Sequence, residues 1–278
     1  MSNVDRYGIE QAADCAKELG FSGVEFFFMA NHPELIPDIK TAKKYKALLE
    51  ERGLSTPCVS VGVSLVRNDK PDEICKGDLD GALSALEFAA ALGARLFHHT
   101  LIMGLSEEKT RGLEYDGIFS LVLDGASIIA KRAAELGVTV LYEPQGKYFN
   151  GHERLGKFYK EMKKSYGNVG ICCDLGNSFW VGEEPYGFFE EFSKDIKHIH
   201  LKDYLITDAP IDEKSAKALQ GGKYISEAEV GTGVVDMQKF YRLWHSIDYD
   251  GFMSLEDYVN IRPPEVIAKI MKRIDSDF

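Results

Sequence analysis

The chain of 278 residues has 33 lysines and arginines against 44 aspartates and glutamates, which gives a formal net charge of −11. This acidic balance disfavours nucleic-acid binding, which needs a basic face, and indicates a solvated exterior. No apolar run is long enough to span a membrane and no signal peptide is found, so we expect a cytoplasmic protein without a membrane partner.

A single domain is expected over residues 1–278. No linker or low-complexity tract divides the chain, and its length suits one (β/α)₈ barrel of roughly 250 residues. Apolar residues make up 45% of the sequence, which is ordinary for a protein with a sizeable core. The five cysteines include the neighbours Cys172 and Cys173 in a strand-like run, so we expect small buried residues rather than disulfides.

Short apolar runs alternate with helical stretches, which predicts an α/β protein with a parallel sheet. Strands are expected at 24–28, 55–65, 95–101, 138–144, 169–174, 196–203 and 251–257. Helices are expected at 8–19, 38–52, 77–94, 118–136, 152–166, 186–194, 236–247 and 264–275. Glycine stands between helix and strand in LGFSG, LGARL, LGVTV and YDGFM, as such turns require. The predicted fold is a (β/α)₈ TIM barrel.

The first strand of this barrel is expected to be absent or irregular, because residues 1–7, MSNVDRY, form a poor strand. The segment pairs weakly, or the barrel is open there, or a neighbouring chain fills the gap. A long loop is expected at 204–235. It ends in EVGTGVVD, where Asp236 is a suitable N-cap for the next helix.

Four side chains of metal-binding types each end their own apolar run. They are Glu143 in VTVLYEP, Asp174 in VGICCD, His200 in IKHIHLKD and Glu256 in GFMSLED. The carboxyl ends of barrel strands converge on one face, so we expect these groups to meet there. Three carboxylates and one imidazole favour a single divalent cation, and Mn²⁺, Mg²⁺, Co²⁺ and Zn²⁺ are all chemically possible.

These positions resemble the xylose-isomerase-like TIM-barrel superfamily of sugar isomerases and epimerases, which includes ketose 3-epimerases and inosose isomerases and dehydratases. The resemblance rests on LGFSGVEF, YEP, CCDLGN, HIHLKD, EVGTGVVD and YDGFMSLED, in that order. It implies one divalent metal ion, bound by Glu143, Asp174, His200 and Glu256. It also implies that both glutamates serve as acid and base while the metal stabilises an enediolate formed from a small carbohydrate.

Three positions depart from the family pattern. Asn177 stands where many epimerases have a substrate-binding His, and Lys202 follows the metal His where many have Arg. Asp257 replaces a frequent Pro. These differences count against a ketose 3-epimerase without affecting the metal residues.

Other candidate substrate-binding residues have structural alternatives. Of His98 and His99, only one can point inward, because neighbours on a strand face opposite ways. Glu25 orients a ligand or makes a structural hydrogen bond. His152 reaches over the site or simply starts a helix at the rim. Asn177 and Lys202 contact substrate oxygens, or Lys202 points to solvent.

Four functions compete. The first is an isomerase or epimerase of a keto sugar or related polyol, and relatives of that kind often form homo-oligomers. The second is a lyase on the same metal site, either a dehydratase or a 3-oxo-glycoside-cleaving subunit. Endonuclease-IV-like DNA repair is disfavoured by Asn177 and by the net charge. A binding module without catalysis is disfavoured because all four ligand positions are occupied.

Overall fold

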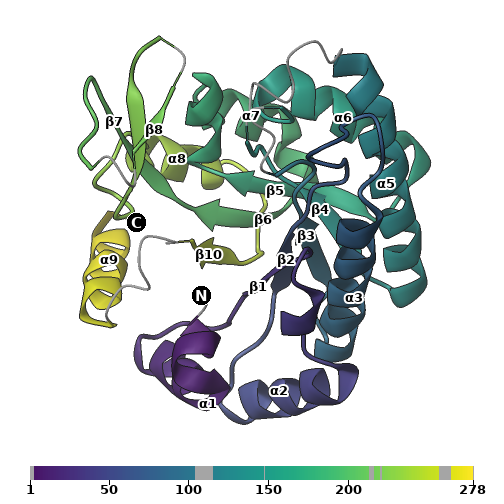
Figure 1. The fold of residues 1–278 in the computed structure, drawn as a ribbon. Coiled ribbons are helices and arrows are strands. Elements are labelled where there is room, and N and C mark those ends of the chain that lie inside the picture. Colours follow the sequence, from purple (N-terminus) through teal and green to yellow (C-terminus); the bar gives the residue numbers. More distant parts are fainter. Residues whose placement is uncertain are drawn as a thin grey trace.

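The computed structural model describes residues 3–103, 115–146, 148–212, 216–219, 221–256 and 264–277. Its centre is a parallel sheet of seven strands in the order β1-β2-β3-β4-β5-β6-β10. The strands are β1 (Phe26–Met29), β2 (Cys58–Gly62), β3 (Leu96–His99), β4 (Thr139–Tyr142), β5 (Val169–Asp174), β6 (Ile196–Leu201) and β10 (Met253–Leu255). The sheet is curled and helices surround its outside, so the expected barrel architecture is confirmed (Figure 1).

The helices follow the strands in alternation, as the hydrophobic pattern predicts. They are α1 (Asn3–Glu18), α2 (Ile39–Glu51), α3 (Lys76–Leu92), α5 (Tyr115–Leu136), α6 (Gly151–Ser165), α7 (Pro185–Phe192), α8 (Met237–Trp244) and α9 (Pro264–Asp277). Short 3₁₀ helices are η1 (Pro33–Leu35), η2 (Asn177–Val181) and η3 (Ser193–Asp195). Asp236 caps α8 as expected, since its side chain accepts a 2.9 Å hydrogen bond from the Lys239 N–H. Gly93 ends α3 with φ 92°, a left-handed conformation that glycine adopts without strain.

The sheet has two free ends, β1 and β10, which are not paired with each other in the described part of the chain. Residues 3–7 belong to α1 and therefore supply no eighth strand. Of the three alternatives for the N-terminus, weak strand pairing by this segment is thus wrong for the residues described. Among the residues that the structure describes, the sheet does not close between β1 and β10.

The expectation of an irregular loop over 204–235 is wrong. The segment contains an antiparallel sheet in the order β7-β9-β8, built from β7 (Asp203–Thr207), β8 (Lys217–Ala218) and β9 (Tyr224–Ala228). Asp203 pairs with Ala228 and Thr207 with Tyr224. Both long strands are mostly half-buried, so they lack the continuous apolar run that marks the strands of the barrel. In Figure 1 this small sheet projects beside β6 and α8.

The interior of the curled sheet changes character along its strands. Cys58, Leu141 and Cys172 form a small buried cluster, with Leu96 packed against it. Polar side chains two residues further along the same strands lie nearer to the carboxyl ends, because strand side chains alternate between faces. In the described part of the chain, no helix is long and apolar enough to span a membrane.

Candidate metal centre and active site

The four predicted ligand residues converge at the carboxyl ends of their strands. Glu143 follows β4, Asp174 ends β5, His200 lies in β6 and Glu256 follows β10. In the sheet register, Asp174 is paired with His200 on one side, and Ser254 is paired with His200 on the other. One potential ligand atom from each of the four residues lies within 4.8 Å of the others. Positions far apart in the sequence therefore meet at one point.

His200 presents its two ring nitrogens to different partners. Nδ1 lies 3.1 Å from Glu143 Oε2 and 2.8 Å from Glu256 Oε2. Nε2 lies 3.2 Å from Glu25 Oε1. Burial opposes a charge on the imidazole, but Cys172 and the carboxylates of Glu25 and Glu256 raise the pKa of His200 well above its ordinary value. The surroundings of this imidazole thus attract positive charge.

Two carboxylate oxygens in the cluster lack hydrogen-bond donors. Asp174 Oδ1 accepts from the backbone N–H groups of Gly176 and Asn177, both at 2.7 Å. Asp174 Oδ2 is buried and accepts no hydrogen bond among the described residues. Glu256 Oε2 is also buried, and its contact with His200 Nδ1 at 2.8 Å is an ion pair without hydrogen-bond geometry. A buried acceptor left unsatisfied costs about 1–3 kcal/mol, and more when it is charged. A cation bound to these oxygens would remove that cost.

Lys202 lies inside the cluster rather than in solvent. Its Nζ lies 2.8 Å from Glu256 Oε1 and 3.9 Å from Asp174 Oδ2, and the side chain is buried. Burial would raise the pKa of Glu256, but Lys202 and His200 outweigh it and hold that pKa below its ordinary value. Burial, with Glu256 and Glu143 nearby, raises the pKa of Asp174 to about 8. Lys202 therefore compensates one carboxylate and leaves the other short of positive charge.

The donor set of the cluster fits a divalent cation. Lys202 pairs with Glu256 and lies 3.9 Å from Asp174, while Glu25 and Glu143 lie against the ring of His200. Buried charges persist when they are paired or coordinate a metal. Carboxylate oxygens with one imidazole nitrogen suit Mg²⁺, Mn²⁺, Co²⁺ or Zn²⁺. Glu143, Asp174, His200 and Glu256 are the residues that would hold the ion.

His98 and His99 face opposite sides of β3, as strand alternation predicts. His98 Nε2 lies 3.3 Å from Glu143 Oε1, and its ring centroid is 5.7 Å from that of His200. His99 instead packs edge-to-face on Tyr142 with ring centroids 5.3 Å apart, and Nδ1 lies 2.8 Å from the Thr100 carbonyl oxygen. The structure brings His98 into the cluster and places His99 on the outer face of the sheet.

Comparison with known proteins places this architecture in one family. The sequence model of one protein family, described as xylose isomerase-like TIM barrel, matches residues 13–276. The chain belongs to this family. It is 25% identical to an inosose dehydratase of Clostridium beijerinckii over 164 residues, which is 56% of this chain and 53% of that protein. It is 28% identical to an inosose dehydratase of Bacillus cereus (strain AH820) over 137 residues, 48% of this chain and 45% of that protein. The matches span about half the length of these curated relatives.

Solved structures share the fold over nearly the whole chain. The 3-keto-D-glucoside 4-epimerase of E. coli superposes with a TM-score of 0.73 at 17% identity, over 97% of this chain and 95% of that one. The IOLI protein, solved with a zinc atom, superposes with a TM-score of 0.72 at 15% identity, over 96% of this chain and 92% of that one. A xylose isomerase-like TIM barrel protein from Mycobacterium smegmatis, solved with magnesium, superposes with a TM-score of 0.68 at 17% identity, over 97% of this chain and 87% of that one. At these identities the likeness establishes the fold alone.

Asn177, which departs from the xylose isomerase-like pattern, lies at the edge of the cluster directly after the Asp174 turn. Its Oδ1 accepts a 3.1 Å hydrogen bond from the Tyr204 hydroxyl, and its backbone carbonyl accepts one of 2.8 Å from Asn150 Nδ2. The Asn177 Nδ2 donor is buried and has no partner among the described residues. The third departure, Asp257, lies outside the described residues.

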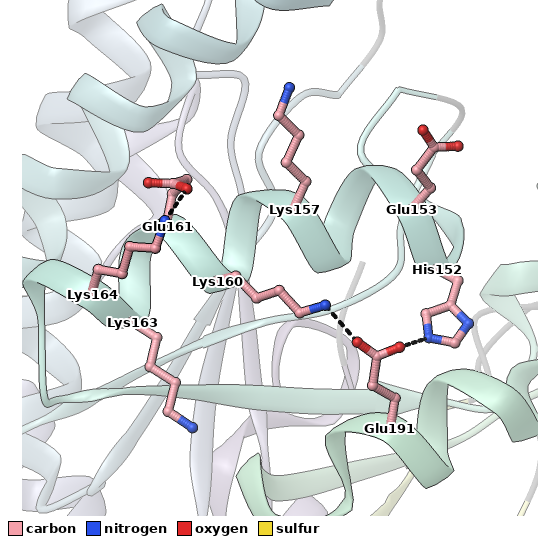
Figure 2. A pocket seen from close by; sticks show the side chains of 8 residues that line it. All are labelled: His152, Glu153, Lys157, Lys160, Glu161, Lys163, Lys164 and Glu191. Atoms are coloured by element: carbon pink, nitrogen blue, oxygen red, sulfur yellow. Dashed lines mark hydrogen bonds and ion pairs between the residues drawn. The ribbon is translucent and has the colours of Figure 1, made fainter.

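His152 is not brought to the cluster. It is the second residue of α6, and its ring nitrogen Nε2 is hydrogen-bonded to Glu191 of α7. Its ring packs against Phe188 and Phe192. Figure 2 shows His152 and Lys160 both directed at Glu191 in an open surface pocket of about 890 Å³ between the two helices. The expectation that His152 reaches over the site is therefore wrong, and its other interpretation, a residue that starts a helix, holds.

Sequence reasoning missed three residues that touch the predicted site. Ser60 donates to Glu25, Tyr204 donates to Asn177, and Cys172 lies within ligand distance of Glu143 and His200. Strand alternation could have indicated Cys172, because it is two residues before Asp174 on the same face. No local signal marks Tyr204, since its position depends on the antiparallel sheet.

Proposed function

We propose that this protein is a divalent-metal-dependent isomerase or epimerase that transfers a proton at the carbon next to the carbonyl of a keto sugar or related polyol. The observation that carries the proposal is a set of three carboxylates and one imidazole within 4.8 Å of one another, at or just beyond the ends of four strands. Three of these residues are buried and Glu256 is partly buried. The small sugar-like substrates named for the curated and structural relatives support the substrate class.

A bound divalent ion would polarise the substrate carbonyl and offset the negative charge that forms when the adjacent proton leaves. The chain supplies the acid and the base. Glu143 and Glu256 follow β4 and β10, which are separated in the sheet by β5 and β6. They can therefore approach a substrate from two sides, so that one carboxylate takes a proton and the other returns one.

Three further side chains hold and orient the reacting groups. Lys202 binds Glu256 at 2.8 Å and so fixes this carboxylate. His98 faces the other catalytic carboxylate, since its Nε2 lies 3.3 Å from Glu143 Oε1. The unpartnered Nδ2 of Asn177 offers a neutral donor to a substrate oxygen, and a buried donor of this kind rejects a substrate that lacks the oxygen.

Dehydration is a second candidate, because the curated relatives described above are inosose dehydratases. It starts with the same removal of a proton next to a carbonyl. The acid then protonates a departing hydroxyl group instead of returning the proton to carbon. The two functions therefore share Glu143, Glu256 and the metal residues, and they differ in the product.

Solvent-deuterium exchange tests the proposal. Chelator-stripped protein reloaded with Co²⁺ or Mn²⁺ is incubated in D₂O with a panel of keto sugars and inososes, and products are followed by NMR and mass spectrometry. Deuterium in a recovered ketose or its epimer is the expected result. Loss of water from the substrate selects the dehydratase. Absence of both with metal-loaded protein would contradict any proton abstraction at this site.

Glu143→Gln and Glu256→Gln should each lower turnover of the substrate so identified by at least about 100-fold, because general acid–base catalysis contributes roughly 10²–10⁴-fold. Glu191→Gln is the matched control, since Glu191 pairs with Lys160 and His152 on the outer surface. Full turnover by either of the first two variants would rule out the mechanism with two glutamates.

A further inference from the structure

Glu25 contacts three polar side chains beneath the metal cluster. Its Oε1 accepts a short hydrogen bond from Ser60 Oγ of β2 and lies 3.2 Å from His200 Nε2 of β6. Its Oε2 lies 2.9 Å from His198 Nε2, also of β6. A carboxylate has no proton to donate, so each of these partners donates to it. Glu25 is thus the common acceptor of one hydroxyl and two imidazoles.

The contact with Glu25 decides which nitrogen of His200 remains available. A neutral imidazole has a single N–H, and the nitrogen without it carries the lone pair that binds a metal. When Glu25 accepts the Nε2–H, the lone pair lies on Nδ1. Nδ1 is the atom that lies near the carboxylates of Glu143 and Glu256.

The contacts of Glu25 extend through Ser60 to a second imidazole. Because the Ser60 hydroxyl donates to Glu25, its oxygen accepts from His98 Nδ1 at 3.1 Å. His98 Nε2 then carries no hydrogen, so it donates no hydrogen bond to Glu143 Oε1, which lies 3.3 Å away. Glu25 is therefore linked to His200 directly and to His98 through Ser60.

The same network crosses the open side of the sheet. Glu25 precedes β1, and the imidazole of His198 lies 2.9 Å both from Glu25 and from Ser254 Oγ of β10. The strands β1 and β10 share no backbone ladder in the described part of the chain. Side-chain hydrogen bonds therefore link the two edges at the level of the metal cluster.

We infer that Glu25 is a positioning residue of the metal centre. It fixes the ring of His200 and the nitrogen that carries its proton, so that the lone pair lies on Nδ1. This inference rests on the proposed metal-dependent function. A purely structural role, in which Glu25 only joins β1 to its neighbours, requires the same contacts but predicts no effect on the metal.

Cobalt binding separates the two roles. Chelator-stripped wild type, Glu25→Gln, Ser60→Ala and the surface control Glu191→Gln are titrated with Co²⁺, and the visible absorption of the bound ion is recorded. Glu25→Gln should bind Co²⁺ about 10- to 100-fold more weakly and with an altered spectrum, as expected when the partner of a metal-bound His is lost. Ser60→Ala should show a smaller loss in the same direction, and Glu191→Gln should match wild type.

Thermal unfolding of the same stripped proteins completes the test. A lower unfolding temperature for Glu25→Gln with unchanged Co²⁺ affinity and spectrum would show a structural role and overturn the inference. If Glu25→Gln does not fold, wild-type affinity and spectrum for Ser60→Ala overturn it instead. Wild-type protein that binds no Co²⁺ would refute the proposed function, a result distinct from either of these.

Discussion

At the scale of single residues, His98 and His99 show how strand alternation gives neighbours opposite surroundings. His98 lies among polar groups inside the curled sheet, near Glu143 and His200. His99 is buried on the outer face among aromatic rings. Burial lowers the pKa of His99 from 6.5 to about 4, because a charged imidazole cannot be solvated there. His99 is therefore neutral in the folded protein.

This residue should make stability depend on pH. The unfolded state takes up a proton at the ordinary pKa of 6.5, whereas folded His99 resists it down to about 4. Above pH 6.5, His99 is neutral in both states and its titration does not change the free energy of unfolding. As the pH falls from 6.5 towards 4, the proton taken up by the unfolded state lowers that free energy by about 1.4 kcal/mol per pH unit. Urea unfolding of wild type and His99→Gln over this range checks the effect. The variant should show the shallower slope, and identical slopes would refute the prediction.

At the scale of secondary-structure elements, α3 approaches the end of β1 so closely that only glycine fits. A Cβ added at Gly81 would lie 2.0 Å from the Ala30 carbonyl oxygen, which is backbone and cannot turn aside. Gly77, in the first turn of the same helix, has nothing within 4 Å of an added Cβ. Helix propensity favours alanine over glycine, so packing and propensity oppose each other at Gly81.

The two glycines should therefore respond to alanine in opposite directions. Gly81→Ala should lower the free energy of unfolding by about 1–3 kcal/mol, because α3 must move away from Ala30. Gly77→Ala should leave it unchanged or raise it by up to about 1 kcal/mol. Denaturant unfolding of both variants makes the comparison. A Gly81→Ala protein as stable as Gly77→Ala would show that the close approach is absent in solution.

At the scale of the whole molecule, the barrel gathers acidic side chains from widely separated parts of the chain and buries them together. Asp174 carries a clear free-energy cost of burial. One of its oxygens accepts no hydrogen bond, and burial raises its pKa to about 8. A divalent cation bound at the cluster would offset the repulsion only in the folded state. Metal binding would therefore be linked to folding.

Removing the metal should lower thermal stability, and the loss should depend on Asp174. At a metal concentration about 100 times the Kd, the linkage is worth about 2.7 kcal/mol, which corresponds to several degrees in Tm for a protein of this size. Asp174→Asn should lose most of this rise in Tm. Once stripped of metal, the variant should be at least as stable as stripped wild type, because its neutral amide avoids the burial cost that raises the pKa of Asp174. Calorimetry of the stripped and loaded proteins measures the rise in Tm on metal loading and the stability of the stripped forms. An undiminished rise in the variant would exclude Asp174 as a ligand.

The sequence by itself determined the parallel α/β architecture and the strand-end positions of the four candidate ligand residues. Glu143, Asp174, His200 and Glu256 each end an apolar run, and parallel strands bring their carboxyl ends to one edge. The tertiary structure alone decided that Lys202 turns into the cluster, that Glu25 contacts His200, and that β7 and β9 pair. The periodicity of a strand fixes which face a side chain occupies. Which side chains meet across the interior depends on the curvature and register of the assembled sheet, and no single segment encodes these.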